Sequence, residues 1–202
     1  IPTHAPGGQL VLVTEPETQL PALALAEQLV TRDFQEAICM AFVPAMLLAD
    51  WDMPDGAVAL ANPLSVDLAV MRPSLLPGLV QALRHNRARQ TGRVRLFEIG
   101  ATFKAPATAG EAPTETQTLA LVACGSAHAE QWGVAGRALD FHDLKGDVEA
   151  LIAQGGEPQR WRFDAQHLPG WLHPGRAASI LCDEVVVGHI GAVHPRLASA
   201  LD

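Results

Sequence analysis

The stretch NPLSVDLAVMRPSLLPGLVQALRHNRARQTGRVRLFEIGATF, residues 62–103, decides which fold this chain adopts. Its apolar residues recur at helical spacing after Ser74, whose hydroxyl can accept a hydrogen bond at a helix start. These apolar positions are Leu75, Leu76, Leu79, Val80 and Leu83. The pattern predicts a helix from Ser74 to about Gln90, preceded by an extended segment over 66–71 and followed by a strand over 93–100.

Positive charge is concentrated in this part of a chain whose formal net charge is -8. Seven of the 14 Lys and Arg residues lie between Arg72 and Lys104, and Glu98 is the only carboxylate among them. Such a segment indicates contact with an anionic partner or an acidic protein surface. The candidate contacts with a partner protein or RNA are Arg72, Arg84, Arg87 and Arg89. The last three also lie near the end of the expected helix, where the helix dipole itself favours cations.

Composition limits the class of protein. With 202 residues, 49% of them hydrophobic, the chain can bury a sizeable core. It contains no apolar run of the ~20 residues that cross a bilayer and no signal-peptide pattern at its start. Its three cysteines are distant from one another and lie in apolar contexts, which predicts buried free thiols in a reducing cytoplasm. They are Cys39, Cys124 and Cys182. Their spacing does not suit a zinc site.

The remaining patterns predict an α+β fold, with a mostly antiparallel sheet flanked by helices. Helices are expected from Leu20 after a Thr18 cap, over 44–51, and from about Phe141 to Gly155. The apolar run over 37–43 predicts a buried strand, and the run over 119–124 predicts a central strand. A mobile loop is expected over 104–118. Further strands are expected over 161–163, 178–182 and 185–193, with a hairpin turn at 183–184 and another turn over 52–56.

Several motifs occur in a specific order along the chain. The stretch 62–103 contributes Asn62, Pro63, Ser65, Met71, Arg72, Ser74, Leu75, Gly78, Leu79, Asn86, Arg89, Leu96, Phe97, Glu98 and Gly100. Upstream lie FQE at 34–36 and Phe42; downstream lie DFHDLKG at 140–146, LHPG at 172–175 and GHIGAVHP at 188–195. Taken together, these motifs resemble the beta subunit of bacterial phenylalanyl-tRNA synthetase, in its region shaped like a class II aminoacyl-tRNA synthetase/biotin synthetase-like core.

The resemblance implies an organisation and a set of partners. Residues 1–18 would be a linker from a preceding domain, and 19–202 a synthetase core-like module that precedes a C-terminal RNA-binding domain. The first helix and strand would build a subunit interface. In this family the partners are a catalytic alpha subunit and tRNA-Phe, within an (αβ)2 heterotetramer. ATP and Mg²⁺ are implied for the parent complex, and no cofactor for this segment.

The adenylation chemistry of class II synthetases needs Arg side chains that grip the triphosphate in a planar, bidentate manner. Where the family of active cores has Arg at the end of a strand, this chain has Lys104, a point charge, and Pro106 replaces the acidic residue that follows. Glu111 and Glu115 would repel a triphosphate. We therefore expect no catalytic, cofactor-binding or metal-binding residue here, and a module that scaffolds the alpha subunit and positions tRNA.

Other constellations leave alternatives open. Asp140, His142, Asp143 and Asp147 cluster at a helix start, as metal ligands or an acid–base pair would. A helix N-terminus attracts carboxylates for simpler reasons, namely its dipole and free N–H groups. His173 and His194 each precede Pro, which favours fixed turns. Trp132, Trp161 and Trp171 are expected to pack in the core or at its edge rather than to stack on bases.

Two other functions remain as hypotheses. A stand-alone enzyme of the biotin-ligase or lipoate-ligase type would need a Gly-Arg-Gly segment and a catalytic Lys, and neither Lys104 nor Lys145 has that setting. A sequence-independent RNA-binding module would use the three Arg residues at the end of the expected helix, and its affinity would fall steeply with salt.

Overall fold

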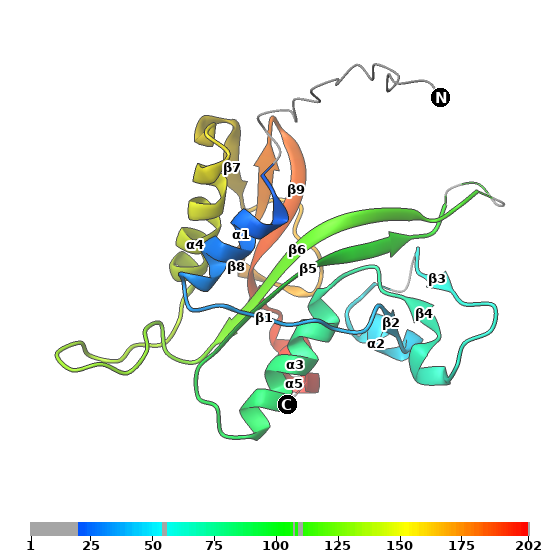
Figure 1. The fold of residues 1–202 in the computed structure, drawn as a ribbon, viewed down its shortest axis with the longest axis horizontal. Helices are drawn as coiled ribbons and strands as arrows, with labels where there is room; N and C mark the ends of the chain where they lie inside the picture. The colour runs from blue at the N-terminus through cyan, green and yellow to red at the C-terminus, as the bar shows by residue number, and fades with distance from the viewer. Residues whose placement is uncertain (1–19, 54–55, 107, 109–110, 202) are drawn as a thin grey trace, which may run out of the picture.

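The computed structural model describes residues 20–53, 56–106, 108 and 111–201 (Figure 1). The linker expected over 1–18, including the helix cap at Thr18, lies outside these residues. The α-helices are α1 (Ala22–Val30), α2 (Ala45–Asp50), α3 (Leu76–Ala88), α4 (Phe141–Gln154) and α5 (Pro195–Leu201). Short 3-10 helices are η1 (Val66–Leu68) and η2 (Pro158–Arg160). The strands are β1 (Gln35–Glu36), β2 (Phe42–Val43), β3 (Val58–Ala59), β4 (Val70–Met71), β5 (Val94–Lys104), β6 (Thr114–Cys124), β7 (Trp161–Asp164), β8 (Leu172–Cys182) and β9 (Val185–Val193).

Within the described residues the strands form three three-stranded sheets, with the orders β1-β5-β6, β2-β4-β3 and β7-β8-β9. All their pairings are antiparallel except that of β1 with β5. β5 and β6 pair without a break from Val94↔Cys124 to Lys104↔Thr114. In Figure 1 this long ribbon crosses the molecule, with α4 beside β7, β8 and β9, and α2 near the hairpin end. The expected α+β class is confirmed, although the sheet is divided into three.

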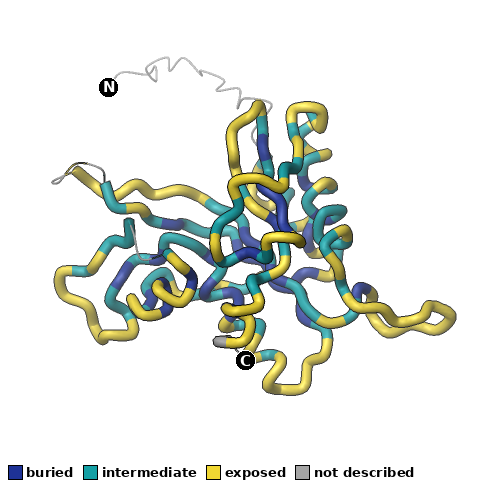
Figure 2. The backbone as a smooth tube through the Cα atoms, turned by 180° about the vertical axis from the view of Figure 1, so that it is seen from behind, coloured by how far each residue is buried: buried dark blue, intermediate teal, exposed yellow. Residues whose placement is uncertain are grey.

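Strand β5 separates two parts of the core because successive side chains of a strand point to opposite faces. Val94 and Leu96 face a cluster built mainly from α2, α3 and β6. Phe97 faces a second cluster with Leu29 of α1 and Leu151 of α4. Figure 2 shows the buried residues in the middle of the molecule and the exposed ones on its projecting loops. The stretch 62–103 therefore supplies the strand, β5, against which both core clusters pack.

The helices and the hairpin turn agree closely with the sequence. α3 begins at Leu76, whose backbone N–H donates to the Ser74 hydroxyl at 3.2 Å, and it ends two residues before Gln90. α4 ends where the Gly155 pair was expected to stop it. Residues 183 and 184 both have positive φ, 47° and 66°, as a tight two-residue hairpin turn requires.

The apolar run over 37–43 is not the buried strand that was expected. Only Gln35–Glu36 and Phe42–Val43 pair as strands, and they belong to different sheets. Between them burial alternates: Ala37 and Cys39 pack on the core, whereas Ile38 and Met40 are 91% and 63% exposed. An all-apolar run predicts burial on both faces, and this chain covers only one of them.

Three further expectations were wrong in detail. Residues 66–68 form η1 rather than extended chain, so that β4 is short. Residues 114–118 were expected in a loop but extend β6, because β-branched Thr suits a strand that has a partner throughout. The segment 119–124 lies in β6, at the edge of its three-stranded sheet, and β5 is central. No helix within the described ranges has the length and apolar character that a bilayer span requires.

Candidate functional site

Arg72 lies inside the protein, where its side chain contacts two separate segments, β5 and the chain around Cys39. Its side chain forms an ion pair with Glu98, Nη1 to Oε1 2.6 Å, and the two residues are 6% and 3% exposed. Its Nε donates to the Ala101 carbonyl at 2.9 Å and its Nη1 to the Cys39 carbonyl at 3.3 Å. A Cβ on Gly100 would lie 2.6 Å from Nη2, so this close approach needs glycine. The guanidinium therefore has no exposed face for an RNA phosphate or a partner, unlike the other three candidates.

Cys39 shares this buried site. Its backbone N–H donates to Glu98 Oε1 at 3.3 Å. The pKa of the Cys39 thiol is raised to about 11, mainly by burial and to a lesser extent by the hydrogen bond with Glu98. The thiol is therefore protonated and unreactive at neutral pH. All three cysteines are free, as expected, but they are half-buried rather than fully buried.

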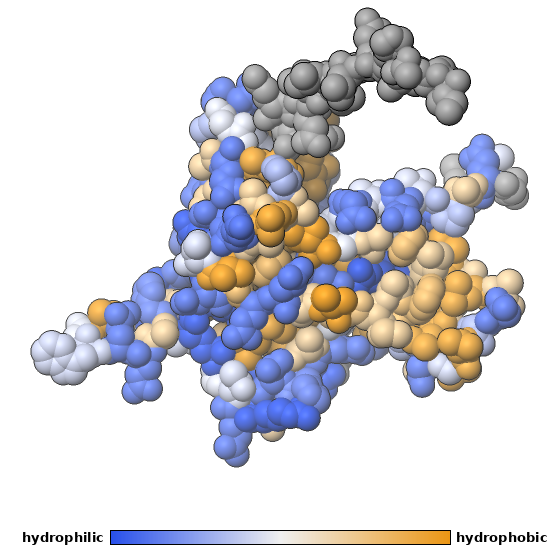
Figure 3. Space-filling view, in the orientation of Figure 1, coloured by the Kyte–Doolittle hydropathy of each residue, from blue (hydrophilic) through white to orange (hydrophobic). Residues whose placement is uncertain are grey.

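An exposed apolar surface lies beside the Arg72 site. It consists of Ile38, Met40, Met46, Leu64 and Val66, each of which is largely exposed. Figure 3 shows apolar side chains gathered over the region of β2, α2 and η1. A hollow of about 370 Å³ opens here, with Met40, Val43 and Leu68 among its lining residues. Exposed apolar side chains gathered in one region are typical of a protein–protein contact.

The other three candidate arginines lie in the last turns of α3 and at its C-cap, Arg89. Arg84, Arg87 and Arg89 are exposed, and none forms an ion pair with another residue in the described part of the chain. Arg89 Nη1 donates to the His85 carbonyl at 3.3 Å, at the end of the helix. The cluster is therefore free to meet an anionic partner, and its contacts stay a prediction.

The residues around the end of β5 do not fit an ATP and Mg²⁺ site. Lys104 is exposed and pairs with Thr114 across the ribbon, and the N–H of the next residue donates to the Gly56 carbonyl at 2.7 Å. The nearest buried guanidinium, that of Arg72, is already bound to Glu98. A triphosphate site needs guanidinium groups that are free to grip oxygens, and these residues do not supply them.

A cavity of about 1880 Å³ lies between α3, α4, β6 and β9. It is larger than the ~300–1,000 Å³ of most small-molecule sites, and apolar side chains form most of its lining. Trp51, Trp171 and His189 lie along it. Burial lowers the pKa of His189 below its ordinary value. Its Nδ1 lies 3.3 Å from the Ser179 hydroxyl. The cationic side chains in the lining are Arg84, Arg87 and Arg176.

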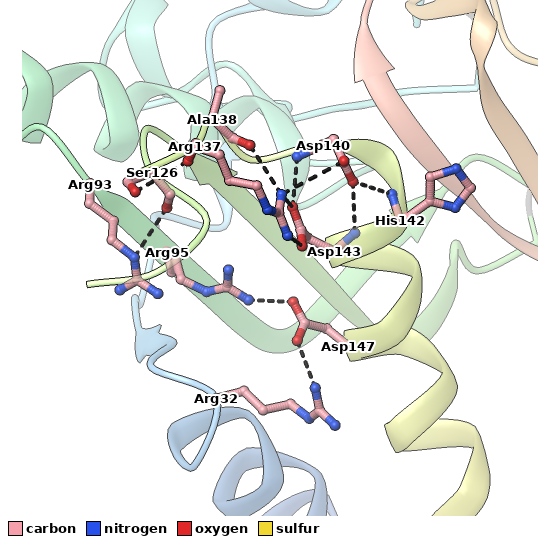
Figure 4. A network of polar contacts seen from close by, with 10 residues as sticks. All are labelled: Arg32, Arg93, Arg95, Ser126, Arg137, Ala138, Asp140, His142, Asp143 and Asp147. Carbon is pink, nitrogen blue, oxygen red and sulfur yellow. Dashed lines mark hydrogen bonds and ion pairs between the residues drawn. The ribbon is translucent and has the colours of Figure 1, made fainter. Parts of the chain in front are cut away.

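The acidic cluster at the start of α4 is a helix cap (Figure 4). The N–H groups of His142 and Asp143 donate to Asp140 Oδ1 at 2.8 and 3.1 Å, and the Asp140 N–H donates to Asp143 Oδ2 at 2.9 Å. These reciprocal bonds form a capping box. The Arg137 guanidinium, which donates to Asp143 Oδ2 at 2.7 Å, holds the pKa of that carboxyl well below its usual range.

Asp147, one turn further along α4, is buried between two arginines that the sequence did not link to it. Arg32 Nη1 lies 3.0 Å from its Oδ1, and Arg95 pairs with its Oδ2. Arg95 also lies over the Phe34 ring, 4.2 Å from the centroid. No group of three or more His, Cys, Asp or Glu side chains in the described part of the chain is arranged to hold a metal ion. Asp140 and Asp143 are engaged in the helix cap and Asp147 in two ion pairs.

The two His-Pro pairs were expected to form fixed turns, but His173–Pro174 lies within β8 and His194 directly precedes α5. Nδ1 of His173 accepts from the Gly175 N–H at 3.0 Å, and Nδ1 of His194 accepts from the Arg196 N–H at 3.1 Å. Two of the three tryptophans pack as expected: Trp171 lies 5.9 Å from Trp51 between ring centroids, and Trp161 is half-buried. Trp132 contradicts the expectation, because it is 99% exposed in the segment between β6 and α4.

Comparison with known proteins places this geometry in a family. A family model described as the phenylalanyl tRNA synthetase beta chain CLM domain matches residues 1–202. The phenylalanine–tRNA ligase beta subunit of Xanthomonas oryzae pv. oryzae (strain MAFF 311018) is 53% identical over 202 residues, and that of Xylella fastidiosa (strain 9a5c) is 48% identical. Both alignments cover 100% of this chain and 25% of the relative, so the chain spans a quarter of their length.

Among solved structures, a pyrrolysyl-tRNA synthetase, PylSc of Desulfitobacterium hafniense, matches with a TM-score of 0.59 and 17% identity. The match covers 90% of this chain and 62% of that one. This likeness confirms the expected class II synthetase-like fold and no more than the fold. The full-length family match and the high identity of the relatives together show that this chain belongs to the phenylalanyl-tRNA synthetase beta chain CLM domain family.

Proposed function

We propose that the chain is a non-catalytic module of a phenylalanine–tRNA ligase beta subunit, which holds the catalytic alpha subunit and helps to position tRNA-Phe. ATP and Mg²⁺ then act in the alpha subunit, within a cytoplasmic (αβ)2 complex. The observation that carries the proposal is the exposed apolar surface of Ile38, Met40, Met46, Leu64 and Val66. The whole protein is about four times as long as this chain if it resembles its relatives, so other segments share the task.

The apolar surface is supported as a protein contact by its chemistry. Ile38 and Met40 are exposed in a segment whose Ala37, Cys39 and Val43 side chains pack on the core. The buried pair of Arg72 and Glu98 holds that segment in place through the Cys39 backbone. Exposing these side chains to water is unfavourable by ~25 cal/mol per Å², and a partner that covers them recovers this free energy. A fixed, apolar surface is therefore suited to a stable subunit interface.

The lack of catalysis is supported by the residues at the end of β5. Lys104 cannot form the planar fork of an arginine, and Arg72 is bound to Glu98. We expect the isolated chain to show no phenylalanine-dependent exchange of pyrophosphate into ATP. Formation of phenylalanyl-adenylate by this chain alone would contradict the proposal, as would tight ATP binding that is lost on Lys145→Ala, which would favour a biotin-ligase or lipoate-ligase type of enzyme.

A direct test compares two substitutions of equal exposure. Met40 and Val185 are 63% and 64% exposed, and only Met40 belongs to the apolar surface. In the full-length beta subunit, Met40→Asp should raise the dissociation constant for the alpha subunit about tenfold or more, because it buries an unpaired charge. Val185→Asp should leave it unchanged. Equal effects of the two, measured by analytical ultracentrifugation of the mixed subunits, would remove the support for this surface.

The contribution to tRNA binding is proposed for Arg84, Arg87 and Arg89. Each phosphate contact adds to the dependence of affinity on salt. Reversing the three charges to Glu in the assembled ligase should weaken tRNA-Phe binding and reduce the slope of log K against log salt by up to ~3. If the triple variant instead weakens only the association with the alpha subunit, these residues serve the interface. Tight RNA binding by the isolated chain would favour the stand-alone RNA-binding module.

A further inference from the structure

Residues 125–139 form a protruding hairpin between β6 and α4, which stands away from the body of the molecule in Figure 1. Its two arms are joined by a bridge between Ser126 and Ala138. The N–H of Ala127 donates to the Arg137 carbonyl at 2.9 Å, and that of Leu139 to the Gly125 carbonyl at 3.0 Å. The segment therefore has an ordered base from which its tip projects.

The base is also fixed to the rest of the fold. Gly125 has φ 92°, and a Cβ there would lie 2.0 Å from the Gly92 carbonyl oxygen, so the two backbones are in close contact. Arg93 Nε donates to the Ser126 carbonyl at 3.2 Å. On the other arm, Arg137 is bound to Asp143 in the cap of α4. The hairpin is thereby held at one angle to β5, β6 and α4.

The tip is apolar and uncovered. Trp132 is 99% exposed, and Val134 is also exposed. Neither residue contributes to the two core clusters. Tryptophan is the residue most enriched among the anchors of protein interfaces, because its large rigid side chain fills a pocket at a low cost in entropy. A fixed base that presents an uncovered Trp is arranged for insertion into a pocket.

The charge of the hairpin selects the kind of partner. Apart from His128, its only ionisable side chains are Glu130 and Arg137, and Arg137 is neutralised by Asp143. An RNA-stacking site or an anionic membrane contact would place free cations beside the aromatic ring, whereas here the nearest charged side chain in sequence is acidic. The hairpin therefore fits a protein surface with an apolar pocket and a neutral or cationic rim.

The base of the hairpin is also connected to the turn that precedes β1, although the hairpin and the apolar surface lie toward opposite ends of the molecule in Figure 1. Arg93, which holds its base, also pairs with Asp33 at 3.2 Å. Asp33 lies in the turn between α1 and β1, directly before the segment that carries Ile38 and Met40. α1 itself exposes Leu23 and Val30. One arginine thus joins the hairpin to the segment that leads into the apolar surface.

We propose that Trp132 inserts into an apolar pocket of the alpha subunit, as an anchor separate from the apolar surface. This inference rests on the proposed function, because it takes the same subunit as the partner. The contact is supplied by residues far from Ile38 and Met40 in sequence, and it depends on the hairpin that Gly125 and Arg93 hold.

The test uses photo-crosslinking in the complete ligase. The full-length beta subunit is produced with p-benzoylphenylalanine in place of Trp132, assembled with the alpha subunit and tRNA-Phe, and irradiated. A second sample carries the same group in place of Met40, and a third carries it in place of the exposed Gln159 as a background control. The expected product of the first sample is a crosslink to an apolar segment of the alpha subunit, identified by mass spectrometry.

The outcomes separate this inference from the proposed function. A crosslink from position 132 to another segment of the beta polypeptide, to tRNA, or to nothing above the Gln159 background overturns the Trp132 inference. A crosslink from position 40 to the alpha subunit in the same experiment would keep the proposed function intact. If position 132 reaches the alpha subunit and position 40 does not, the Trp132 anchor stands and the assignment of the apolar surface fails.

Affinity provides a second readout. Trp132→Ala should raise the dissociation constant of the two subunits by about 30-fold or more, as truncation of a central aromatic anchor does. Trp132→Phe should retain most of the affinity, since it keeps a large aromatic side chain. Because Trp132 packs on neither core cluster, the thermal stability of the free beta subunit should be the same for both variants. An unchanged dissociation constant for Trp132→Ala would overturn the inference.

Discussion

Arg72 and Glu98 bring opposite charges into a region from which water is almost excluded. Each charge loses hydration there, and the pair compensates through one short ion pair and through hydrogen bonds to the Ala101 and Cys39 carbonyls. Oxygen Oε2 of Glu98 is buried without a hydrogen-bond partner among the described residues. The pair therefore depends on both members, and removing either leaves an uncompensated buried charge.

The first prediction follows from this dependence. Arg72→Met should reduce the free energy of unfolding by about 3–5 kcal/mol, because the Glu98 carboxylate remains buried and unpaired. The double variant Arg72→Met with Glu98→Leu should recover most of that loss. Chemical denaturation of the four proteins in the cycle measures the coupling. If the two single changes add without coupling, the ion pair does not hold this site.

A second prediction at the residue scale concerns two glycines of the protruding hairpin, Gly125 and Gly133. Both have positive φ, 92° and 84°, but only Gly125 has backbone where a Cβ would be placed. Gly125→Ala should cost about 3 kcal/mol or more, whereas Gly133→Ala, with open space around it, should cost about 1 kcal/mol. Equal costs in urea denaturation would show that the contact of Gly125 with Gly92 is not maintained in solution.

At the scale of elements, α4 shows how far local sequence determines structure. Its N-cap Asp140, its capping partner Asp143 and its C-terminal Gly155 are all local signals, and the helix begins and ends where they indicate. The local sequence could not predict the ion pairs of Asp147, because its partners Arg32 and Arg95 lie 115 and 52 residues away in the sequence. Only the packing of α1 and β5 against α4 brings these three charges together.

The third prediction tests this cap. Asp140→Ala should lower the free energy of unfolding by about 1 kcal/mol, because it leaves two N–H groups at the start of α4 without an acceptor. Asp140→Asn keeps an oxygen in the same position and should retain most of the stability. Thermal unfolding of the two variants distinguishes the cases. Similar losses would mean that the charge of Asp140, rather than its capping oxygen, stabilises the helix.

The segment 37–43 is the element that the sequence described least well. Its continuous apolar run has the composition of a strand buried on both faces, yet the structure gives it one covered face and one open face. An apolar composition predicts that both faces are covered, but it does not say whether the second covering comes from this chain. The proposed subunit interface would explain why the open face is apolar as well.

At the scale of the whole molecule, His189 links the large cavity to pH. Its pKa lies below the ordinary 6.5 because burial disfavours the charged ring. The unfolded chain therefore binds a proton more readily than the folded one as pH falls below 6.5. The stability due to the neutral ring is complete above that pH and is lost as pH falls through the folded-state pKa.

The fourth prediction compares the chain with a His189→Gln variant between pH 7.5 and 5. The free energy of unfolding of the unmodified chain should decrease more steeply on acidification than that of the variant, because glutamine does not titrate. The difference between the two curves isolates His189 from the carboxylates, which both proteins share. Parallel curves would show that the ring is hydrated in solution and not held in the buried environment of Trp171 and Ser179.

The sequence by itself determined the α+β class, the bounds of α4 and β9, the turn at 183–184 and the family to which the motifs belong. These depend on local chemistry: apolar spacing, capping residues and turn residues act over a few positions. Only the tertiary structure separated Arg72 from Arg84, Arg87 and Arg89, exposed Trp132, and divided the strands into three sheets. Burial and strand pairing depend on segments that are distant in the sequence. The neighbours that the fold brings to a charged side chain decide whether it is buried or free to contact a partner.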